Sequence, residues 1–299
     1  MPLMAEAFVL WPESRSLVRI EGADARTFLQ GIVSNDVNKV SPARAVYAAL
    51  LTPQGKYLHD FFIAELGGAL MLDCEAARRD DLLRRLARFK LRSKAALAPG
   101  PDGAAVALIY GAGALAALGL AAERGVAKPF AGGLVYADPR LCEIGARAIL
   151  PQGARAALAA AGIRPGSPAD YESSRIELGL PDGSRDLEIE KSILLESGFD
   201  ELAGVDWDKG CYMGQELTAR THYRALVKKR LVPVRIDGPT PAPGTPILAG
   251  GAEAGVMRSA GDGAGLALLK IEALSGIEPL RAGPARLVPR KPFWLKLSG

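Results

Sequence analysis

The chain is predicted to have an α+β fold with a small β-barrel at its C-terminal end. Strands and helices in the first part do not alternate in the regular order that a doubly wound parallel sheet requires. After residue 228 the sequence changes to short apolar runs that are broken by proline and glycine, which is typical of a barrel. We therefore expect two domains, one of residues 1–227 and one of residues 228–299.

Length and composition are those of a folded protein with a substantial core. The chain has 299 residues, of which 49% are hydrophobic, and this is enough for two or three compact units. Its net charge of +4 favours anions in general, but the basic residues are spread along the chain. Aromatic residues make up 6% and are too scattered to form base-stacking platforms, so a nucleic-acid partner is not favoured.

Neither a signal nor a membrane span is expected. Residues Met1–Glu6 lack the basic start and the apolar run of a secretory signal, and no later stretch approaches about 18 uninterrupted apolar residues. The three cysteines, Cys74, Cys142 and Cys211, are an odd number without a CxxC pair, which indicates neither a disulfide framework nor a self-contained zinc site. We expect a cytoplasmic protein with no membrane partner.

The first elements of the main body are predicted to be a strand, a short helix and a hairpin. Leu17–Ile20 alternates like a strand, and Asp24 is well placed to cap the helix that follows. The apolar runs Val46–Leu51 and Tyr57–Ile63 are separated by Pro53–Lys56, a good turn sequence. This arrangement predicts an antiparallel hairpin.

The next segments continue the mixture of strands and helices. Leu70–Cys74 is predicted to be a strand. Leu82, Leu86 and Phe89 then recur at helical spacing with arginines on the other side, which predicts an amphipathic helix. The alanine-rich and glycine-rich part that follows is expected to contain a strand near Val106–Ile109 and helices near residues 114–123 and 154–161.

The next helix signal is at Ser167-Pro168. Serine is a preferred N-cap and proline fits the first helical position, so the helix should run through Glu177 and end at Gly179. The strands of the expected barrel are residues 231–236, 245–248, 255–259, 265–270 and 285–288.

The segment Lys209–Glu216, with the sequence Lys-Gly-Cys-Tyr-Met-Gly-Gln-Glu, carries the most unusual chemistry of the chain. Cys211 lies between two glycines and close to Lys209, and the following helix-forming residues place it just before a helix N-terminus. A nearby cation and the positive end of a helix both lower the pKa of a thiol, and the thiolate attacks electrophiles or binds metal. The alternative is that Cys211 is a small buried hydrophobe beside a tight turn.

The octet Lys209–Glu216 resembles the signature of the YgfZ-type folate-binding proteins, which are relatives of the glycine cleavage system T protein, an aminomethyltransferase. Its extension to His222 is most similar to the mitochondrial iron-sulfur assembly factor of that family. Further similar segments are Gly22–Gly31, Leu51–Lys56, Arg175–Gly179 and Gly265–Leu269. The resemblance implies two interwoven α+β units around a folate-binding core, with the C-terminal barrel closing one side.

The resemblance also implies a set of residues that bind tetrahydrofolate. Glu177 stands where the T-protein family has a glutamate that hydrogen-bonds the pterin, and a carboxylate suits a pterin because its two oxygens accept from two neighbouring N–H groups. The other expected folate ligands are Arg175, Asn35, Asp36, Tyr212, Gln215 and Glu216. From local pattern alone, Glu177 would be an exposed helix-end residue, and Asn35-Asp36 an ordinary polar turn.

The pair His59-Asp60 lies where aminomethyltransferases carry adjacent aspartates, one of which is essential for moving the one-carbon unit. Only one aspartate is kept here, which puts aminomethyl transfer in doubt. Asp60 is nevertheless the candidate catalytic residue of a transferase. His59 is expected to be an ordinary strand residue that faces solvent or a polar partner.

The function that the resemblance implies is that of a tetrahydrofolate-binding accessory factor for the assembly or repair of iron-sulfur proteins, particularly those with [4Fe-4S] clusters. Cys211 is the central residue, with Lys209 favouring its thiolate. One thiolate cannot hold a cluster alone, so no metal site is expected on this chain by itself. Cys211 would instead be one ligand of a transient cluster shared with an A-type carrier protein, which serves client iron-sulfur enzymes.

Two other functions stay open. The chain could be a folate-dependent aminomethyltransferase, with Asp60 in catalysis and Cys211 merely structural. It could also be a folate-sensing or interaction module without chemistry of its own, because a fold does not determine a function. Whether the protein is an enzyme is therefore uncertain, and a conventional enzyme is not the preferred reading.

Overall fold

The computed structural model describes residues 6–296. Met1–Ala5, on which the expectation of no secretory signal was based, lie outside the described part. Contacts divide the chain into two discontinuous units. Unit 1 comprises Met1–Leu51, His59–Pro168 and Ala203–Met213, and unit 2 comprises Thr52–Leu58, Ala169–Leu202 and Gly214–Gly299. The contacts thus group the barrel with earlier segments of the chain, whereas the expected division followed the sequence at residues 227 and 228.

A five-stranded sheet carries the first predicted strands. Its strands, in spatial order, are β3 (Val46–Leu51), β4 (Tyr57–Leu66), β5 (Ala69–Glu75), β2 (Arg15–Glu21) and β6 (Ala96–Pro99). The four strands predicted in this region and the pairing of β3 with β4 are confirmed. All six residues of β3 and the first eight of β4 are buried, which explains why both read as apolar runs rather than alternating strands.

Two helices of unit 1 accompany this sheet, α1 (Ala25–Gln30) and α2 (Arg79–Lys90). The predicted amphipathic helix is confirmed, with Leu82 and Leu86 of α2 buried, but Phe89 is 38% exposed. Asp24 occupies the N-cap position of α1 without making a capping bond. Its carboxylate accepts instead from the main-chain N–H of Lys94, because a distant segment competes for it.

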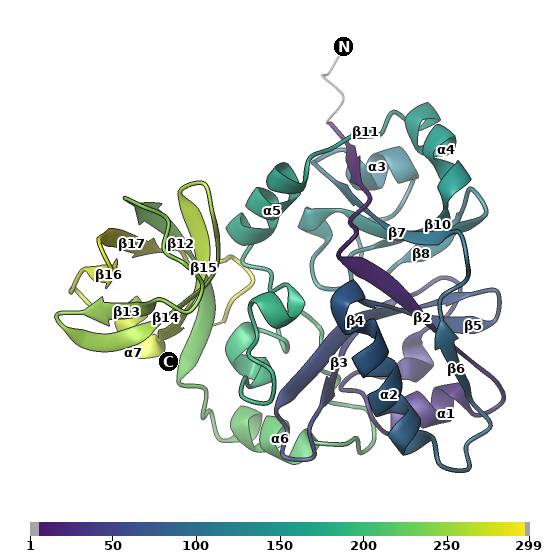
Figure 1. Cartoon of the computed structure of the whole chain (residues 1–299), viewed down its shortest axis with the longest axis horizontal. Helices are drawn as coiled ribbons and strands as arrows, with labels where there is room; N and C mark the ends of the chain where they lie inside the picture. Colours follow the sequence, from purple (N-terminus) through teal and green to yellow (C-terminus); the bar gives the residue numbers. More distant parts are fainter. Residues whose placement is uncertain (1–5, 297–299) are drawn as a thin grey trace. The chain divides into compact units, whose positions relative to one another are not determined.

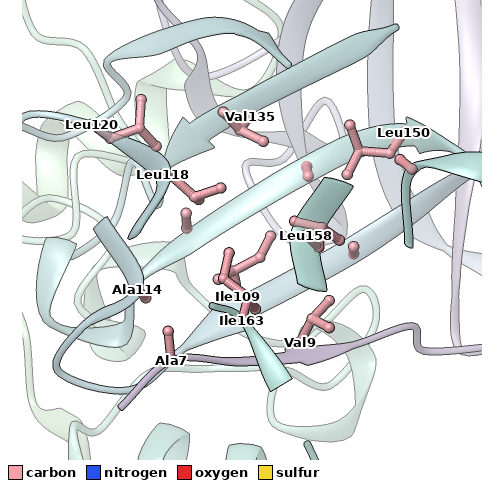
Figure 2. Close-up of a cluster of buried hydrophobic side chains, with 14 residues drawn as sticks. Ala7, Val9, Ile109, Ala114, Leu118, Leu120, Val135, Leu150, Leu158 and Ile163 are labelled. Carbon is pink, nitrogen blue, oxygen red and sulfur yellow. The ribbon is translucent and has the colours of Figure 1, made fainter. Parts of the chain in front are cut away.

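The second sheet of unit 1 has six strands. In order they are β11 (Arg164–Pro165), β1 (Phe8–Leu10), β7 (Ala104–Tyr110), β10 (Ala146–Pro151), β9 (Gly133–Ala137) and β8 (Ala127–Phe130). Helices α3 (Ala114–Leu118) and α4 (Arg155–Ala160) lie on it, shorter than the predicted helices there. Figure 2 shows their side chains, Leu118 and Leu158, meeting Ile109 and Leu150 of the sheet in one buried cluster.

The predicted C-terminal barrel is present in unit 2 as a closed barrel of six strands, one more than the five expected (Figure 1). Its strands, in order, are β12 (Lys229–Asp237), β15 (Ala264–Lys270), β14 (Ala252–Gly261), β13 (Pro246–Ala249), β16 (Leu280–Ala282) and β17 (Ala285–Pro289), with the short helix α7 (Ile271–Leu274) after β15. The α+β class is therefore confirmed together with the barrel.

Two longer helices of unit 2 precede the barrel. Helix α5 (Pro168–Glu177) begins at the predicted proline, and Gly179 beyond its end has a φ of +73°, a left-handed conformation that favours glycine. Ile176 of α5 packs on Leu231 and Leu266 of the barrel. Helix α6 (Gln215–Tyr223) follows the signature cysteine, as predicted.

The remaining helical elements are single 3-10 turns. They are η1 (Val37–Lys39), η2 (Ala76–Arg78), η3 (Cys142–Ile144), η4 (Gln152–Ala154), η5 (Gly183–Arg185) and η6 (Leu194–Ser197). Within residues 6–296, no helix is long and apolar enough to cross a membrane.

Candidate functional site

The segment that contains Cys211 is bound to a second loop of unit 1, and we call residues 203–213 the cysteine loop and residues 30–39 the clamp loop. The main-chain N–H of Asp206 donates to the oxygen of Ser34 at 3.1 Å, and that of Met213 donates to the oxygen of Gly31 at 3.1 Å. The Ser34 hydroxyl donates to the oxygen of Gly204 at 2.6 Å. The two loops are therefore joined along their length.

Lys209 lies at the centre of this junction. Its Nζ atom donates to the main-chain oxygens of three clamp-loop residues, Gln30 at 2.9 Å, Val33 at 2.5 Å and Asn35 at 2.8 Å. Burial lowers the pKa of Lys209 to about 8. All three N–H groups of the ammonium are used by the clamp loop. The contacts thus give Lys209 a structural role, and its influence on the Cys211 thiol stays a prediction.

Asn35 and Asp36 also act within the clamp. The Asn35 amide donates to the main-chain oxygens of Tyr47 and Ala203, both at 2.7 Å, and its oxygen accepts from the N–H of Asp36. The Asp36 carboxylate accepts from the N–H of Asn38 at the start of η1. These bonds agree with the local-turn reading of the pair, while a contact with folate stays a prediction.

Cys211 itself is exposed, whereas Cys74 is buried and Cys142 is half-buried. The reading of Cys211 as a small buried hydrophobe is therefore wrong. Burial raises the pKa of Cys74 to about 12 and raises that of Cys142 as well, so both thiols are held in the unreactive form. Cys211 precedes the N-cap of α6, Gly214, whose φ of +80° favours glycine.

The remaining residues of the octet differ in environment. Tyr212 is 9% exposed, and its ring centroid lies 5.0 Å from the ammonium nitrogen of Lys209, so the ring helps to cover that cation. Gln215 and Glu216 begin α6 in unit 2, where Glu216 is exposed and pairs with Arg220 at 2.6 Å. Their expected contacts with folate stay predictions.

Asp60 is buried in β4, at 4% exposure, and accepts a hydrogen bond from the hydroxyl of Tyr47 at 2.8 Å. Burial, together with the Asp60 carboxylate, raises the pKa of Tyr47 well above its usual value, so the phenol stays a donor. The ring of Tyr47 stacks on that of Phe62 at 4.9 Å between centroids. Asp60 is therefore firmly positioned inside unit 1.

His59 was expected to face either solvent or a polar partner. It has a polar partner and does not face solvent. Its side chain is 3% exposed, and Nε2 lies 3.0 Å from the Asp81 carboxylate of α2. Burial, and next the charge of Arg78, lower the pKa of His59 to about 4. The ring is therefore neutral at physiological pH, and Nε2 carries the hydrogen that Asp81 accepts.

Unit 1 contains a buried charge network that was not predicted from the sequence. Asp73 of β5 accepts from Arg15 of β2 at 2.7 Å and from Arg147 of β10 at 2.6 Å, which ties the two sheets of the unit together. The guanidinium of Arg147 lies 3.8 Å from the ring centroid of Phe62. The available signal was a charge inside an apolar strand, as in Leu-Met-Leu-Asp73-Cys and Ala-Arg147-Ala-Ile-Leu.

Helix α5 in unit 2 carries two of the expected folate ligands, and one of them is exposed whereas the other is buried. Glu177 is exposed, and none of the residues 6–296 pairs with its side chain. Arg175 is 1% exposed and donates to Glu172, to Asp186 and to the oxygen of Leu180. Burial opposes the charge of Arg175, but Asp186 and Glu172 outweigh it and raise its pKa. Its contacts are structural, so a part in folate binding stays a prediction.

The partner of Arg175 links α5 to the barrel. Asp186 accepts from the hydroxyl of Ser259 in β14 at 2.5 Å and from the main-chain N–H of the same residue at 3.0 Å. In the described part of the chain, no group of three or more histidine, cysteine, aspartate or glutamate side chains is arranged to hold a metal ion.

Comparison with known proteins identifies relatives for both parts of the chain. Residues 228–297 match the family model of the CAF17 C-terminal beta-barrel domain. The chain is 35% identical to the mitochondrial iron-sulfur cluster assembly factor IBA57 of Homo sapiens, over 90% of this chain and 79% of that protein. It is 32% identical to the protein of the same name in Mus musculus, over 92% and 81%.

The fold is similar to a solved structure, the glycine cleavage system aminomethyltransferase T of Bartonella henselae. The TM-score is 0.76 at 17% sequence identity, over 95% of this chain and 85% of that one. This likeness shows the fold alone.

The comparisons also correct one expectation. The curated relatives are mitochondrial proteins, so the expectation of a cytoplasmic location is wrong. Cysteine count and the lack of a secretory pattern misled us, because soluble proteins of either compartment share both. The identity over nearly the whole length shows that this chain belongs to the IBA57 family of iron-sulfur cluster assembly factors.

Proposed function

We propose that this protein is an accessory factor for the assembly or repair of iron-sulfur proteins, particularly [4Fe-4S] proteins, and that Cys211 carries its chemistry. The observation that carries the proposal is the exposure of Cys211 on a loop that is itself bound down by Lys209 and Ser34. An exposed thiol on a fixed loop can meet a partner without paying to order the loop first. The printed names of the relatives support the functional class.

The chemistry follows from the number of thiols. A thiolate is a good ligand for iron, but a cluster needs several such ligands. The other two cysteines, the buried Cys74 and the half-buried Cys142, have raised pKa values. Cys211 would therefore donate one ligand to a cluster that an A-type carrier protein holds with its own residues, before the cluster passes to a client enzyme. The cluster is cargo in this scheme and not a resident cofactor.

We propose further that tetrahydrofolate binds with Glu177 as its pterin ligand. The exposed Glu177 side chain has both carboxylate oxygens available, since no described residue pairs with it. Such a carboxylate fits two neighbouring N–H donors of a pterin. Arg175 supports this arrangement indirectly, because its bonds to Glu172 and Asp186 hold the end of α5 in place.

The test of this function is rescue of client enzymes. Cells that lack their own factor would be given the wild type, Cys211→Ser or Cys142→Ser, and aconitase and a tRNA-thiolating radical enzyme would be assayed. Rescue by the wild type and by Cys142→Ser, but not by Cys211→Ser, is expected. Equal rescue by Cys211→Ser would remove the thiol from the mechanism. Failure of every variant, with expression confirmed, would refute the function.

A second candidate function is folate-dependent aminomethyl transfer. It is favoured by the position of Asp60, which is buried and oriented by Tyr47, and by the likeness in fold to an aminomethyltransferase. In this reading the purified protein would convert tetrahydrofolate and an aminomethyl donor to methylenetetrahydrofolate, and Asp60→Asn would abolish turnover. Folate binding without turnover would exclude it.

A further inference from the structure

A strained turn with an exposed apolar residue follows α2 in unit 1. The main-chain N–H of Ser93 donates to the oxygen of Lys90 at 2.8 Å, which closes a four-residue turn. Leu91 has φ 44° and ψ −115°, close to the first central position of a type II′ turn, which is normally glycine. Its side chain is 88% exposed. Leu91 is therefore unfavourable for two reasons: its backbone conformation is strained, and its apolar side chain is exposed to water.

The C-terminal end of this turn is fixed by contacts of Lys94 with Asp24 and Gly22. The main-chain N–H of Lys94 donates to the carboxylate of Asp24 at 2.6 Å. The oxygen of Lys94 would lie 2.2 Å from a Cβ atom at Gly22, so a side chain there would exclude the segment. Helix α2 anchors the other end. Between these two attachments, Leu91 points into solvent.

Four basic residues lie within three positions of Leu91 in the sequence. Arg88, Lys90, Arg92 and Lys94 have no acidic side chain paired with them among residues 6–296, whereas Arg84 and Arg85, one turn earlier, both pair with Asp81. Phe89, at 38% exposure, adds a second apolar side chain. We call residues 88–94 the basic turn.

We propose that the basic turn attaches this protein reversibly to the surface of a bilayer that contains anionic phospholipids. Leu91 and Phe89 would enter the boundary between headgroups and acyl chains, while the surrounding cations meet the lipid phosphates. An apolar tip with lysine and arginine around it is the composition of segments that lie in a membrane interface. Unpaired cations near an anionic leaflet add to the attraction, and salt weakens it.

The same residues suit other partners less well. Lysine is depleted in protein interfaces, and the basic turn contains two lysines, Lys90 and Lys94. Single-stranded nucleic acid is bound by several aromatic side chains on which successive bases stack, and the basic turn has only one, the partly exposed Phe89. The proposal revises our expectation that the protein has no membrane partner. That expectation considered spanning segments, and attachment to a surface requires none.

The experiment is flotation of the full-length protein with vesicles of equimolar phosphatidylcholine and phosphatidylglycerol, compared with vesicles of phosphatidylcholine alone. The test variants are Leu91→Asp, Leu91→Gly and Arg92→Glu. Two variants in unit 2 are matched controls: Ile277→Asp removes a fully exposed apolar side chain, and Arg281→Glu reverses an exposed charge. Each control changes the same property of the protein at another place.

The wild type should float with the anionic vesicles only and be released by salt. Leu91→Asp, Leu91→Gly and Arg92→Glu should each weaken binding about tenfold, whereas both controls should bind as the wild type does. Leu91→Gly relieves the strained backbone, so its loss of binding would not be a folding defect. Equal binding to both kinds of vesicle, or unchanged binding by both Leu91 variants, would overturn the proposal. So would retention by RNA or an acidic polypeptide instead of vesicles.

Discussion

The Nζ atom of Lys209 lies 2.5 Å from the main-chain oxygen of Val33, a residue 176 positions earlier in the chain. This bond and its two companions connect the cysteine loop to the clamp loop, with the ring of Tyr212 beside the ammonium. The lysine of the signature therefore positions the loop that bears Cys211. The stability of that loop can therefore be tested by replacing Lys209, without changing the thiol of Cys211.

Replacing Lys209 by methionine should cost about 2 kcal/mol of unfolding free energy, because three carbonyl oxygens lose their donor while the apolar stem is kept. Amide hydrogen exchange in residues 30–39 should also accelerate. Urea unfolding measures the first effect and exchange mass spectrometry the second. Lys191→Met, at an exposed lysine paired with Glu188, is the control and should change stability little. Unchanged exchange in the clamp loop would contradict the positioning role.

Acid should destabilise the protein through His59. The pKa of histidine in an unfolded chain is about 6.5, and burial lowers it to about 4 in the fold. Between these values the unfolded chain binds a proton that the folded chain does not, so stability present above the upper value is lost as the pH falls toward the lower one. The contribution is at most about 3 kcal/mol.

The measurement for His59 is urea unfolding between about pH 7 and about pH 5. His59→Gln can still donate to Asp81 but cannot titrate, so it should lose less stability over this range than the wild type. If both proteins lose the same amount, His59 is not the group responsible.

Breaking the buried network should be among the most damaging substitutions in unit 1. Asp73→Asn leaves the guanidinium groups of Arg15 and Arg147 without their shared carboxylate, at a cost of about 3 kcal/mol. Thermal unfolding of Asp73→Asn, Arg147→Met and the double variant forms a double-mutant cycle. We expect the double variant to be much less destabilised than the sum of the two singles; additive effects would show that the pair is not coupled.

The strain at Leu91 predicts a stabilising substitution. Leu91→Gly should raise the unfolding free energy by about 1 kcal/mol, because glycine adopts the conformation at no steric cost. Leu91→Ala keeps the strained backbone and is the control, without the gain. Urea unfolding of the two variants decides the question, and a less stable glycine variant would show that the strain is not released.

Glu177 and Arg175 should respond in opposite ways. Glu177→Gln removes an exposed charge, so it should leave stability unchanged and weaken tetrahydrofolate binding about tenfold. Arg175→Leu should destabilise unit 2 by about 3 kcal/mol, because the buried Asp186 would lose its cation and Glu172 would keep only Arg185. Calorimetric titration with tetrahydrofolate and urea unfolding separate the two effects. Unchanged folate affinity in Glu177→Gln would exclude it as a pterin ligand.

The sequence was informative where one short-range pattern decides structure. Some elements depend only on a pattern of a few neighbouring residues, so they could be predicted. They are the turn at Pro53–Lys56, the start of α5 at a proline and the strands of the barrel. Asp24 shows the limit of such rules. Its position before a helix predicts a cap, yet its carboxylate bonds to Lys94, which is 70 residues away in the chain.

By itself the sequence determined the α+β class, the C-terminal barrel and the helix that follows the segment with Cys211. Only the tertiary structure decided that Cys211 is exposed, that Lys209 is surrounded by carbonyl groups, and that Arg175 is buried. Burial and hydrogen-bond partners come from residues far apart in the chain, and the energy of a charged side chain depends on them. A local pattern names the residue type, whereas the fold supplies the environment that makes it reactive or structural.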